Sequence, residues 1–309
     1  MENNIIKRAV EVRCGSSILS TVVISSFLLT TLLISNVAVA NPEVTSREYK
    51  LMLDKKQFNF SNETQKVDLF FRQMKSAVEA AIEREVSGEH ELAKVREVSF
   101  FDTPGSCVLR KNGYSYRDRI DHGESTTSLK FRSPDRYIVG FEDVSSIADG
   151  AKSKFELDIG ANPTNPFVGV YSASTKQPNS ETVMTMGDIN RYFTGFASRY
   201  DFDDSLVLSQ VSDLLVYERV YRGVEIDLGK FDAEVDLTLW YQENPTNGSK
   251  PIVAEVSFSY EDKKAEYTRK VVNRAKTAFE AISNMSPWVD VHSQTKTSFV
   301  YNYDANFCH

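Results

Sequence analysis

Four basic residues lie at strand spacing in one short stretch of the chain. Arg117 and Arg119 are two residues apart, and so are Lys130 and Arg132. Because side chains along a strand alternate between its two faces, each pair projects to one side. A guanidinium group binds phosphate oxygens bidentately, and a lysine supplies a compact positive charge. Four such cations facing one space are suited to a phosphate-rich anion.

Carboxylates occur at the same spacing elsewhere. Three segments carry them: Glu48 with Lys50; Glu156 and Asp158 with Lys154; and Glu234 with Asp236. Carboxylates repel a phosphate chain unless a hard divalent cation lies between them. Mg²⁺ or Mn²⁺ fills that role, because both bind carboxylate and phosphate oxygens. The pattern therefore indicates a metal-assisted phosphate site.

The elements that must position these residues are strands and two long helices. Apolar residues recur at helical spacing over 64–86 and 264–284, and a shorter helix is expected over 186–198. Residues 162–180 are rich in Pro, Asn, Ser and Thr and predict a long loop. Strands are predicted at 45–54, 95–102, 113–121, 126–133, 137–143, 152–159, 214–227, 232–242, 251–260 and 294–303.

A charged alternating face is usually the solvated side of a sheet, so one such strand says little about function. Together the elements say more. Two helices with apolar stripes need sheet surface to cover, and if they cover the outside, the charged faces must point inward. We therefore expect an α+β fold, in which a closed antiparallel β-barrel with a charged lumen is flanked by α-helices.

One segment also resembles a known family. An aromatic-Asp-Thr-Pro turn at Phe101–Pro104 is followed by Leu109, Gly113 and the Arg-x-Arg strand. This order resembles the CYTH family, also called the triphosphate tunnel metalloenzymes. The resemblance implies binding of inorganic or organic triphosphates inside a closed antiparallel barrel.

The resemblance extends, as an order of motifs, over most of the chain after residue 40. Its opening Glu-x-Glu-x-Lys motif falls on Ser46, Glu48 and Lys50, and its late Glu-x-Glu motif falls on Glu255 and Ser257, so two carboxylates are replaced by serine. The implied phosphate ligands are Lys50, Arg117, Arg119, Lys130, Arg132, Arg219 or Arg222, and Lys296. The implied metal ligands are Glu48, Glu156, Asp158, Glu234 or Asp236, and Glu255.

The first 40 residues have the pattern of a signal peptide. Three basic residues precede an apolar run over 18–34, and Ala38-Val39-Ala40 fits a signal peptidase site. A retained membrane anchor is the alternative, because the run is nearly long enough to span a bilayer. We expect cleavage after Ala40, a secreted or periplasmic protein without a stable membrane anchor, and one tunnel domain over 41–309.

The net charge and the cysteines limit the kinds of partner and compartment that this chain can have. Residues 1–40 hold three basic and two acidic residues, so their removal takes the net charge from −7 to −8. An acidic chain argues against a nucleic-acid partner, which requires a broad basic face. Cys107 and Cys308 would both meet an oxidising compartment. Whether they pair or remain separate thiols is left open by the sequence.

The leading interpretation is a metal-dependent hydrolase of inorganic triphosphate, polyphosphate or a nucleoside triphosphate. Adenylyl cyclase activity, also known in the family, is less expected because an exported protein meets little ATP. The alternative is a catalytically inactive polyphosphate- or polyanion-binding module of the cell envelope, because Ser46 and Ser257 replace two metal-side carboxylates. A third possibility is a scaffold that meets another envelope protein, and it requires the charged strand faces to point outward.

Overall fold

The structure is a computed structural model that describes residues 42–179, 181 and 183–309. The predicted signal peptide lies outside the described residues. None of the helices in the described part of the chain is long and apolar enough to cross a membrane. The compact unit described below is residues 41–309.

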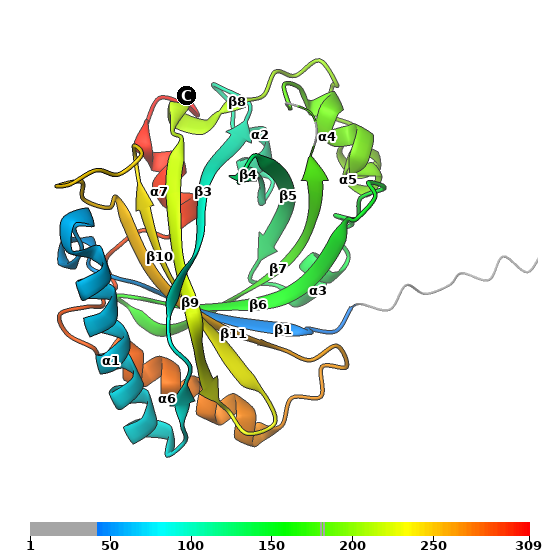
Figure 1. Cartoon of the computed structure of the whole chain (residues 1–309). Helices are drawn as coiled ribbons and strands as arrows, with labels where there is room; N and C mark the ends of the chain where they lie inside the picture. Colours follow the sequence, from blue (N-terminus) through cyan, green and yellow to red (C-terminus); the bar gives the residue numbers. More distant parts are fainter. Residues whose placement is uncertain (1–41, 180, 182) are drawn as a thin grey trace, which may run out of the picture. The chain divides into compact units, whose positions relative to one another are not determined.

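Nine strands close into a barrel (Figure 1). They follow the order β9-β10-β11-β1-β6-β7-β5-β4-β3, and β3 pairs back onto β9. Two short strands, β2 (Val86–Ser87) and β8 (Ser209–Gln210), extend the edges of β9 and β3. The barrel strands are β1 (Ser46–Met52), β3 (Glu91–Asp102), β4 (Tyr114–Asp121), β5 (Glu124–Ser133), β6 (Lys152–Asn162), β7 (Asn165–Asn179), β9 (Val216–Asp227), β10 (Asp232–Tyr241) and β11 (Val253–Glu261).

The predicted closed barrel with flanking helices is confirmed, with one correction. The barrel is mixed, not wholly antiparallel, because β1 and β6 pair in parallel and place Glu48 opposite Asp158. Parallel neighbours cannot be joined by a hairpin. The chain therefore completes α1 and strands β2 to β5 before it returns beside β1.

Helices cover the outside of the barrel in two places. Helices α1 (Glu63–Ile82) and α6 (Arg269–Ser283) pack against each other and against β1 and β9–β11. Phe70, Phe258 and Phe279 are buried in that cluster. Helices α4 (Met186–Tyr192) and α5 (Thr194–Tyr200) cover β4 and β5 in a second cluster. Each large apolar side chain buried there stabilises the fold by about 1.5–3 kcal/mol.

Three predicted elements are wrong. Residues 137–143 form helix α3 (Arg136–Gly140), which begins where the Asp135 carboxylate accepts bonds from the Tyr137 and Ile138 amides. The predicted loop over 162–180 contains β7, because its small polar side chains fit between β5 and β6. The predicted last strand is helix α7 (Lys296–Tyr303), capped by the Thr295 hydroxyl. Short helices also occur as α2 (Val108–Lys111), η1 (Lys55–Gln57), η2 (Phe60–Asn62) and η3 (Val211–Asp213).

The C-terminal segment lies against one end of the barrel. Val300 and Tyr301 of α7 pack in a third apolar cluster with Trp240 of β10 and Val98 of β3. Figure 1 shows α7, in red, beside β10 and β3. The disulfide between Cys107 and Cys308 joins the end of the chain to the start of α2. The pairing that the sequence left open is therefore present in the structure.

Candidate functional site

Alternation along the strands divides the barrel into an apolar outer face and a charged inner face. On β1, Tyr49 and Leu51 are buried against the outer helices, whereas Glu48 and Lys50 lie on the other face. Contacts skip strands on that second face: Lys130 of β5 reaches Asp158 of β6 at 3.1 Å, although β7 lies between the two strands. Such contacts require a concave surface, so the charged face points into the barrel.

Three carboxylates meet on this inner face and are called the acidic group: Glu48, Glu156 and Asp158. One oxygen of each lies within 4.8 Å of one oxygen of the others. The parallel pairing of β1 with β6 brings them together, because it aligns Ser46 with Glu156 and Glu48 with Asp158. Hard carboxylate oxygens at this separation are the ligands that Mg²⁺ and Mn²⁺ prefer.

Basic side chains surround the acidic group. The Lys50 Nζ lies 2.7 Å from a Glu48 oxygen and 2.9 Å from an Asp158 oxygen. Lys130 bonds Glu156, and the Arg132 Nε lies 3.4 Å from Asp158. The carboxylates are therefore neutralised by the chain's own cations.

The pKa values of these groups reflect burial and mutual attraction. Burial opposes the charged form of Glu156, but Lys130, Lys50 and Lys154 outweigh it and lower the pKa of Glu156 to about 2. Burial acts against the Asp158 carboxylate in the same way, and the cations Lys130 and Lys50 again hold its pKa well below the usual range. Burial also opposes the charge of Lys50, yet the surrounding carboxylates raise its pKa. All three groups are charged at neutral pH.

A second cluster, called the basic group, comprises Arg96 of β3, Arg117 and Arg119 of β4, and Lys176 of β7. It faces one buried carboxylate, Glu218 of β9. Glu218 bonds Arg96, accepts a 3.0 Å bond from the Trp240 indole, and lies 3.9 Å from the Arg119 Nε. Burial would raise the pKa of Glu218, but Arg119 and Arg96 lower it. Three arginines, Arg96, Arg117 and Arg119, thus share the Glu218 carboxylate, and Lys176 adds positive charge beside them.

Two guanidinium groups of the basic group are incompletely satisfied. Among the described residues, the buried Nε atoms of Arg117 and Arg119 have no hydrogen-bond partner. Burial lowers the pKa of Arg119 to about 10, with Glu218 opposing the shift. The pKa of Arg117 is held well below its usual range by burial and by Arg119. Buried guanidinium groups that lack hydrogen-bond partners are costly, so this arrangement favours an incoming anion.

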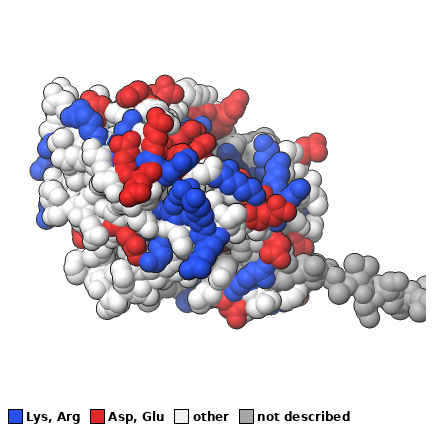
Figure 2. Space-filling model, turned by 90° about the horizontal axis from the view of Figure 1, so that it is seen from below, with Lys and Arg blue, Asp and Glu red and all other residues white. Residues whose placement is uncertain are grey.

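The two clusters belong to one interior. The carboxylates of Glu48 and Glu255 act to raise the pKa of Arg119, although they lie on β1 and β11 on the opposite wall of the barrel. Figure 2 views the molecule from below the orientation of Figure 1 and shows Lys and Arg side chains gathered at the centre of that face, with Asp and Glu side chains beside them. The inner face therefore offers an anion site and a cation site within electrostatic reach of each other.

The structure places most of the predicted site residues on the inner face. That set comprises Lys50, Arg117, Arg119, Lys130, Arg132, Glu48, Glu156, Asp158 and Glu255. Lys296 also reaches it, from α7 instead of a strand, and its Nζ lies 2.8 Å from a Glu255 oxygen. Arg222 pairs with Asp236 at 2.6 Å and with Glu234 at 3.2 Å, away from the acidic group.

Arg219 requires a correction. Its Nε donates a 2.6 Å bond to Glu63 at the start of α1, and Glu63 also accepts bonds from the hydroxyls of Tyr221 and Tyr241. These residues lie on the helix-covered side of β9 and β10, because Tyr221 and Tyr241 belong to the outer cluster. Of the two alternatives at this position, only Arg222 lies on the inner side, where it pairs with Asp236.

Three inner-face residues were missed by the sequence reasoning: Arg96, Lys176 and Glu218. Lys94 and Arg96 are two residues apart, the same spacing as Arg117 and Arg119. The predicted strand began at residue 95, so a start one residue earlier would have shown this basic pair. Glu218 alternates with Val216 and Val220, so its strand gave little sign of a charged face. Lys176 was missed because its strand was predicted to be a loop.

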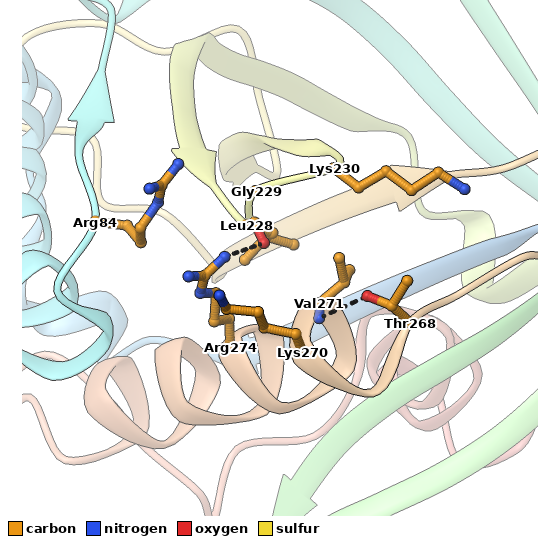
Figure 3. A pocket seen from close by; sticks show the side chains of 8 residues that line it. All are labelled: Arg84, Leu228, Gly229, Lys230, Thr268, Lys270, Val271 and Arg274. Atoms are coloured by element: carbon orange, nitrogen blue, oxygen red, sulfur yellow. Dashed lines mark hydrogen bonds between the residues drawn. The ribbon is translucent and has the colours of Figure 1, made fainter.

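A separate hollow of about 340 Å³ lies outside the barrel at the start of α6 (Figure 3). Arg84, Lys230, Lys270 and Arg274 line it. Three of these cations already have partners: Arg84 bonds Asp227, Lys230 bonds Asp262, and Arg274 donates to the Leu228 carbonyl. The fourth cation, Lys270, is exposed to solvent. The inner face of the barrel is therefore the stronger candidate site.

Comparisons with known proteins give distant structural alignments only. A scan of family models and a search of curated proteins gave no match. A Hippeastrum protein, named as a candidate adenylyl cyclase with a dominant triphosphatase activity, aligns with a TM-score of 0.41 at 13% identity over 84% of this chain and 96% of that chain. Candidate adenylate cyclases from Bacillus halodurans and Vibrio parahaemolyticus align with TM-scores of 0.38 and 0.35, at 13% and 11% identity, over 83% of this chain and 96% and 98% of theirs. Alignments with TM-scores this low carry no information about the function of this chain.

Proposed function

We propose that this protein is an exported, metal-dependent hydrolase of inorganic triphosphate, polyphosphate or a nucleoside triphosphate, and a divergent relative of the triphosphate tunnel metalloenzymes. One observation carries the proposal. Incompletely satisfied guanidinium groups and a three-carboxylate group share the interior of one closed barrel. A polyphosphate chain bound with a divalent cation would satisfy both groups.

The basic group supplies the recognition. Arg117 and Arg119 present planar donor forks that match phosphate oxygens, and each charge-assisted bond in such a site is worth about 1.5–3 kcal/mol. Lys176 adds a positive charge, and its pKa is lowered by burial and by the neighbouring Arg119 and Arg96. An anion bound there would relieve the repulsion among these cations.

The acidic group fits a divalent cation. Glu48, Glu156 and Asp158 supply hard oxygen donors from two adjacent strands, and each is ion-paired with a lysine in the structure. A bound Mg²⁺ or Mn²⁺ would offset phosphate charge and polarise the terminal phosphoryl group. Lys50 and Lys130 pair with the same carboxylates, so a divalent cation would have to displace these ammonium groups, which could then contact the phosphate.

Hydrolysis would break the bond between the terminal phosphorus and the bridging oxygen while water forms a new bond to that phosphorus, and the proton of the water would pass to a phosphate oxygen or to solvent. The leaving phosphate chain gains negative charge. Lys130 and Arg132 lie beside Asp158 and would offset that charge. The chain's contribution is therefore positioning and electrostatic stabilisation. No described residue stands out as a general base.

The direct test is phosphate release from tripolyphosphate, polyphosphate and ATP with Mg²⁺ or Mn²⁺ at neutral to alkaline pH. We expect turnover that Asp158→Asn abolishes. The matched control is Asp227→Asn, which alters an outer carboxylate paired with Arg84 and should leave turnover unchanged. Absence of release from all three substrates would exclude the enzyme.

A binding module without catalysis is the second candidate. Its specific support is that Ser46 and Ser257 lie on the inner face where the resemblance implies carboxylates, and that Ser46 pairs directly with Glu156. Fewer carboxylates weaken metal binding. Calorimetry separates the two functions, because tight polyphosphate binding in EDTA without turnover favours the module, and binding that requires divalent metal favours the hydrolase.

The proposed location is outside the cytoplasm. The disulfide between Cys107 and Cys308 supports it, because such bonds persist in oxidising compartments. Expression with and without residues 1–40, followed by cell fractionation, tests it. A full-length protein that remains uncleaved in the cytoplasmic fraction would contradict the proposal.

A further inference from the structure

A row of register partners crosses neighbouring strands of the barrel wall on the inner face. Arg117 of β4 lies opposite Ser128 of β5, which lies opposite Lys176 of β7. Lys176 in turn lies opposite Lys152 of β6. Residues directly opposite each other in adjacent strands share a face, so all four point into the barrel, and we call them the basic row. Adjacent strands are about 4.8 Å apart, so the row extends the basic group by that distance, to Lys152.

The next row along the same strands has a different charge balance. It contains Lys130 of β5, Ser174 of β7 and Lys154 of β6. Both of its lysines are paired with carboxylates. Lys130 bonds Glu156, and the Lys154 Nζ lies 3.1 Å from the other Glu156 oxygen and 2.6 Å from a Glu261 oxygen. The positive charges of this row are therefore balanced by carboxylates of the chain itself.

The lysines of the basic row have no such balance. Within the part of the chain that the structure describes, neither Lys152 nor Lys176 has a side-chain hydrogen bond or an ion pair, and both are exposed. Like charges directly opposite each other destabilise an antiparallel strand pair. Partial burial and the cations Arg119 and Arg96 also lower the pKa of Lys176. The wall from Arg117 to Lys152 thus carries positive charge that no carboxylate in its own row offsets.

We propose that the basic row is a phosphate track that leads from the basic group to the rim of the barrel, so that the site prefers long-chain polyphosphate to tripolyphosphate. This deepens the proposed function and rests on it. In that function the first phosphates lie between the basic and acidic groups. Lys152 is the first residue of β6, so it contacts only later units of a longer chain. A polyanion bound along the row would relieve the repulsion between Lys152 and Lys176.

The binding test compares two ligands in the same buffer. We would measure the affinities of tripolyphosphate and of a linear polyphosphate several times longer by calorimetry in EDTA. Lys152→Ser should weaken binding of the long chain roughly threefold to tenfold, because one exposed charge-assisted contact is lost, and should leave tripolyphosphate affinity unchanged. Lys263→Ser is the matched control, because it removes one exposed lysine from the turn between β11 and α6 and should change neither affinity. Arg119→Ala should weaken binding of both ligands.

A charge reversal tests the placement of the two lysines without ligand. In Lys152→Glu the repulsion between β6 and β7 becomes an attraction to Lys176, so the melting temperature should rise by about 1–4 °C. The same variant should bind the long polyphosphate more weakly than Lys152→Ser does. A melting temperature that does not rise would mean that the two lysines do not face each other, and it would overturn the basic row.

Each outcome of the binding test has a distinct meaning. A loss that is confined to the long chain in Lys152→Ser and absent in Lys263→Ser supports the track. An equal loss for both ligands, or the same loss in Lys263→Ser, overturns the preference for long chains. No loss in Lys152→Ser overturns the track and leaves the proposed function standing if Arg119→Ala weakens tripolyphosphate binding. Binding of both ligands that ignores Arg119→Ala overturns the proposed function itself.

Discussion

Replacing Arg117 with methionine should weaken ligand binding and stabilise the fold at the same time. Arg117 lies inside the barrel, and within the described part of the chain its Nε has no hydrogen-bond partner. Its guanidinium carbon lies 5.9 Å from the Phe100 ring centre, a contact worth about 0.5–1 kcal/mol. Methionine keeps the apolar stem that packs there and removes the charge. The folded protein then no longer holds a buried cation whose Nε lacks a hydrogen-bond partner.

The substitution is expected to raise the stability of the fold and to lower the affinity for tripolyphosphate. Relief of the buried charge should raise the free energy of unfolding by about 1–3 kcal/mol, less the lost contact with Phe100. In a chain of this size each kcal/mol moves the melting temperature by about 2–4 °C. Loss of a charge-assisted phosphate contact should weaken tripolyphosphate binding by about 1.5–3 kcal/mol, or roughly tenfold to a hundredfold. Thermal unfolding without ligand and calorimetry with tripolyphosphate measure the two effects.

Arg219→Met is the matched control. Arg219 lies on the outer side of the barrel and is paired with Glu63, whose side chain is 3% exposed. Removing one partner of a buried pair should destabilise the fold by about 3–5 kcal/mol, while tripolyphosphate affinity stays unchanged. The two substitutions are therefore expected to change stability in opposite directions, and only Arg117→Met should weaken tripolyphosphate binding. An Arg117→Met protein that melts earlier than the parent and binds tripolyphosphate equally well would refute the inward, unpaired placement of Arg117.

Three further outcomes follow from charge and covalent structure. The pKa values of Lys176 and Arg119 are lowered, that of Arg119 to about 10, so tripolyphosphate affinity should fall as the pH rises toward 10. Binding near that pH should also take up protons, which calorimetry in buffers of different ionisation enthalpy would detect as a buffer-dependent heat. The pKa of Glu156 falls from 4.5 to about 2, so its contribution of roughly 3 kcal/mol is present above pH 4.5 and is lost as pH falls toward 2; Glu156→Gln should flatten that part of the stability profile, and an unchanged profile would contradict the ion pairs. Replacing Cys107 and Cys308 by serine should lower the free energy of unfolding by about 2–5 kcal/mol in denaturant titrations, and a smaller loss would mean that the segment is held without the bond.

The charged inner face could be predicted because strand geometry is local. A period of two residues fixes which side chains share a face, so Arg117 with Arg119 and Lys130 with Arg132 could be grouped without knowing any partner strand. The acidic group needed one more fact, namely that β1 lies beside β6. That neighbour relation is parallel and distant in sequence. The sequence identified the carboxylates but not the pairing that brings Glu48 to Asp158.

The errors occurred where local pattern and tertiary position disagree. Residues 165–179 have prolines and many small polar side chains, which are typical of a loop, yet Ser172 and Ser174 are suitable where the charged side chains of β5 and β6 already fill the inner face. In α7 the alternation of Phe299, Tyr301 and Tyr303 suggests a strand. The Thr295 cap and the burial of Val300 beside Tyr301 in one cluster favour a helix, because adjacent residues of a strand would point to opposite faces.

The turn that carried the family resemblance has a structural role of its own. The Asp102 carboxylate is fully buried and accepts bonds from the amides of Leu109 and Arg110, each at 3.0 Å, and from the Tyr301 hydroxyl at 2.9 Å. It therefore begins α2 and docks α7, and it makes no contact with the acidic or basic group. The residues that made the sequence recognisable organise the end of the barrel where α2 and α7 lie, whereas the side chains suited to chemistry lie farther along the same strands. A motif of this kind is evidence for the barrel's architecture, and the function must be argued separately from the charges inside it.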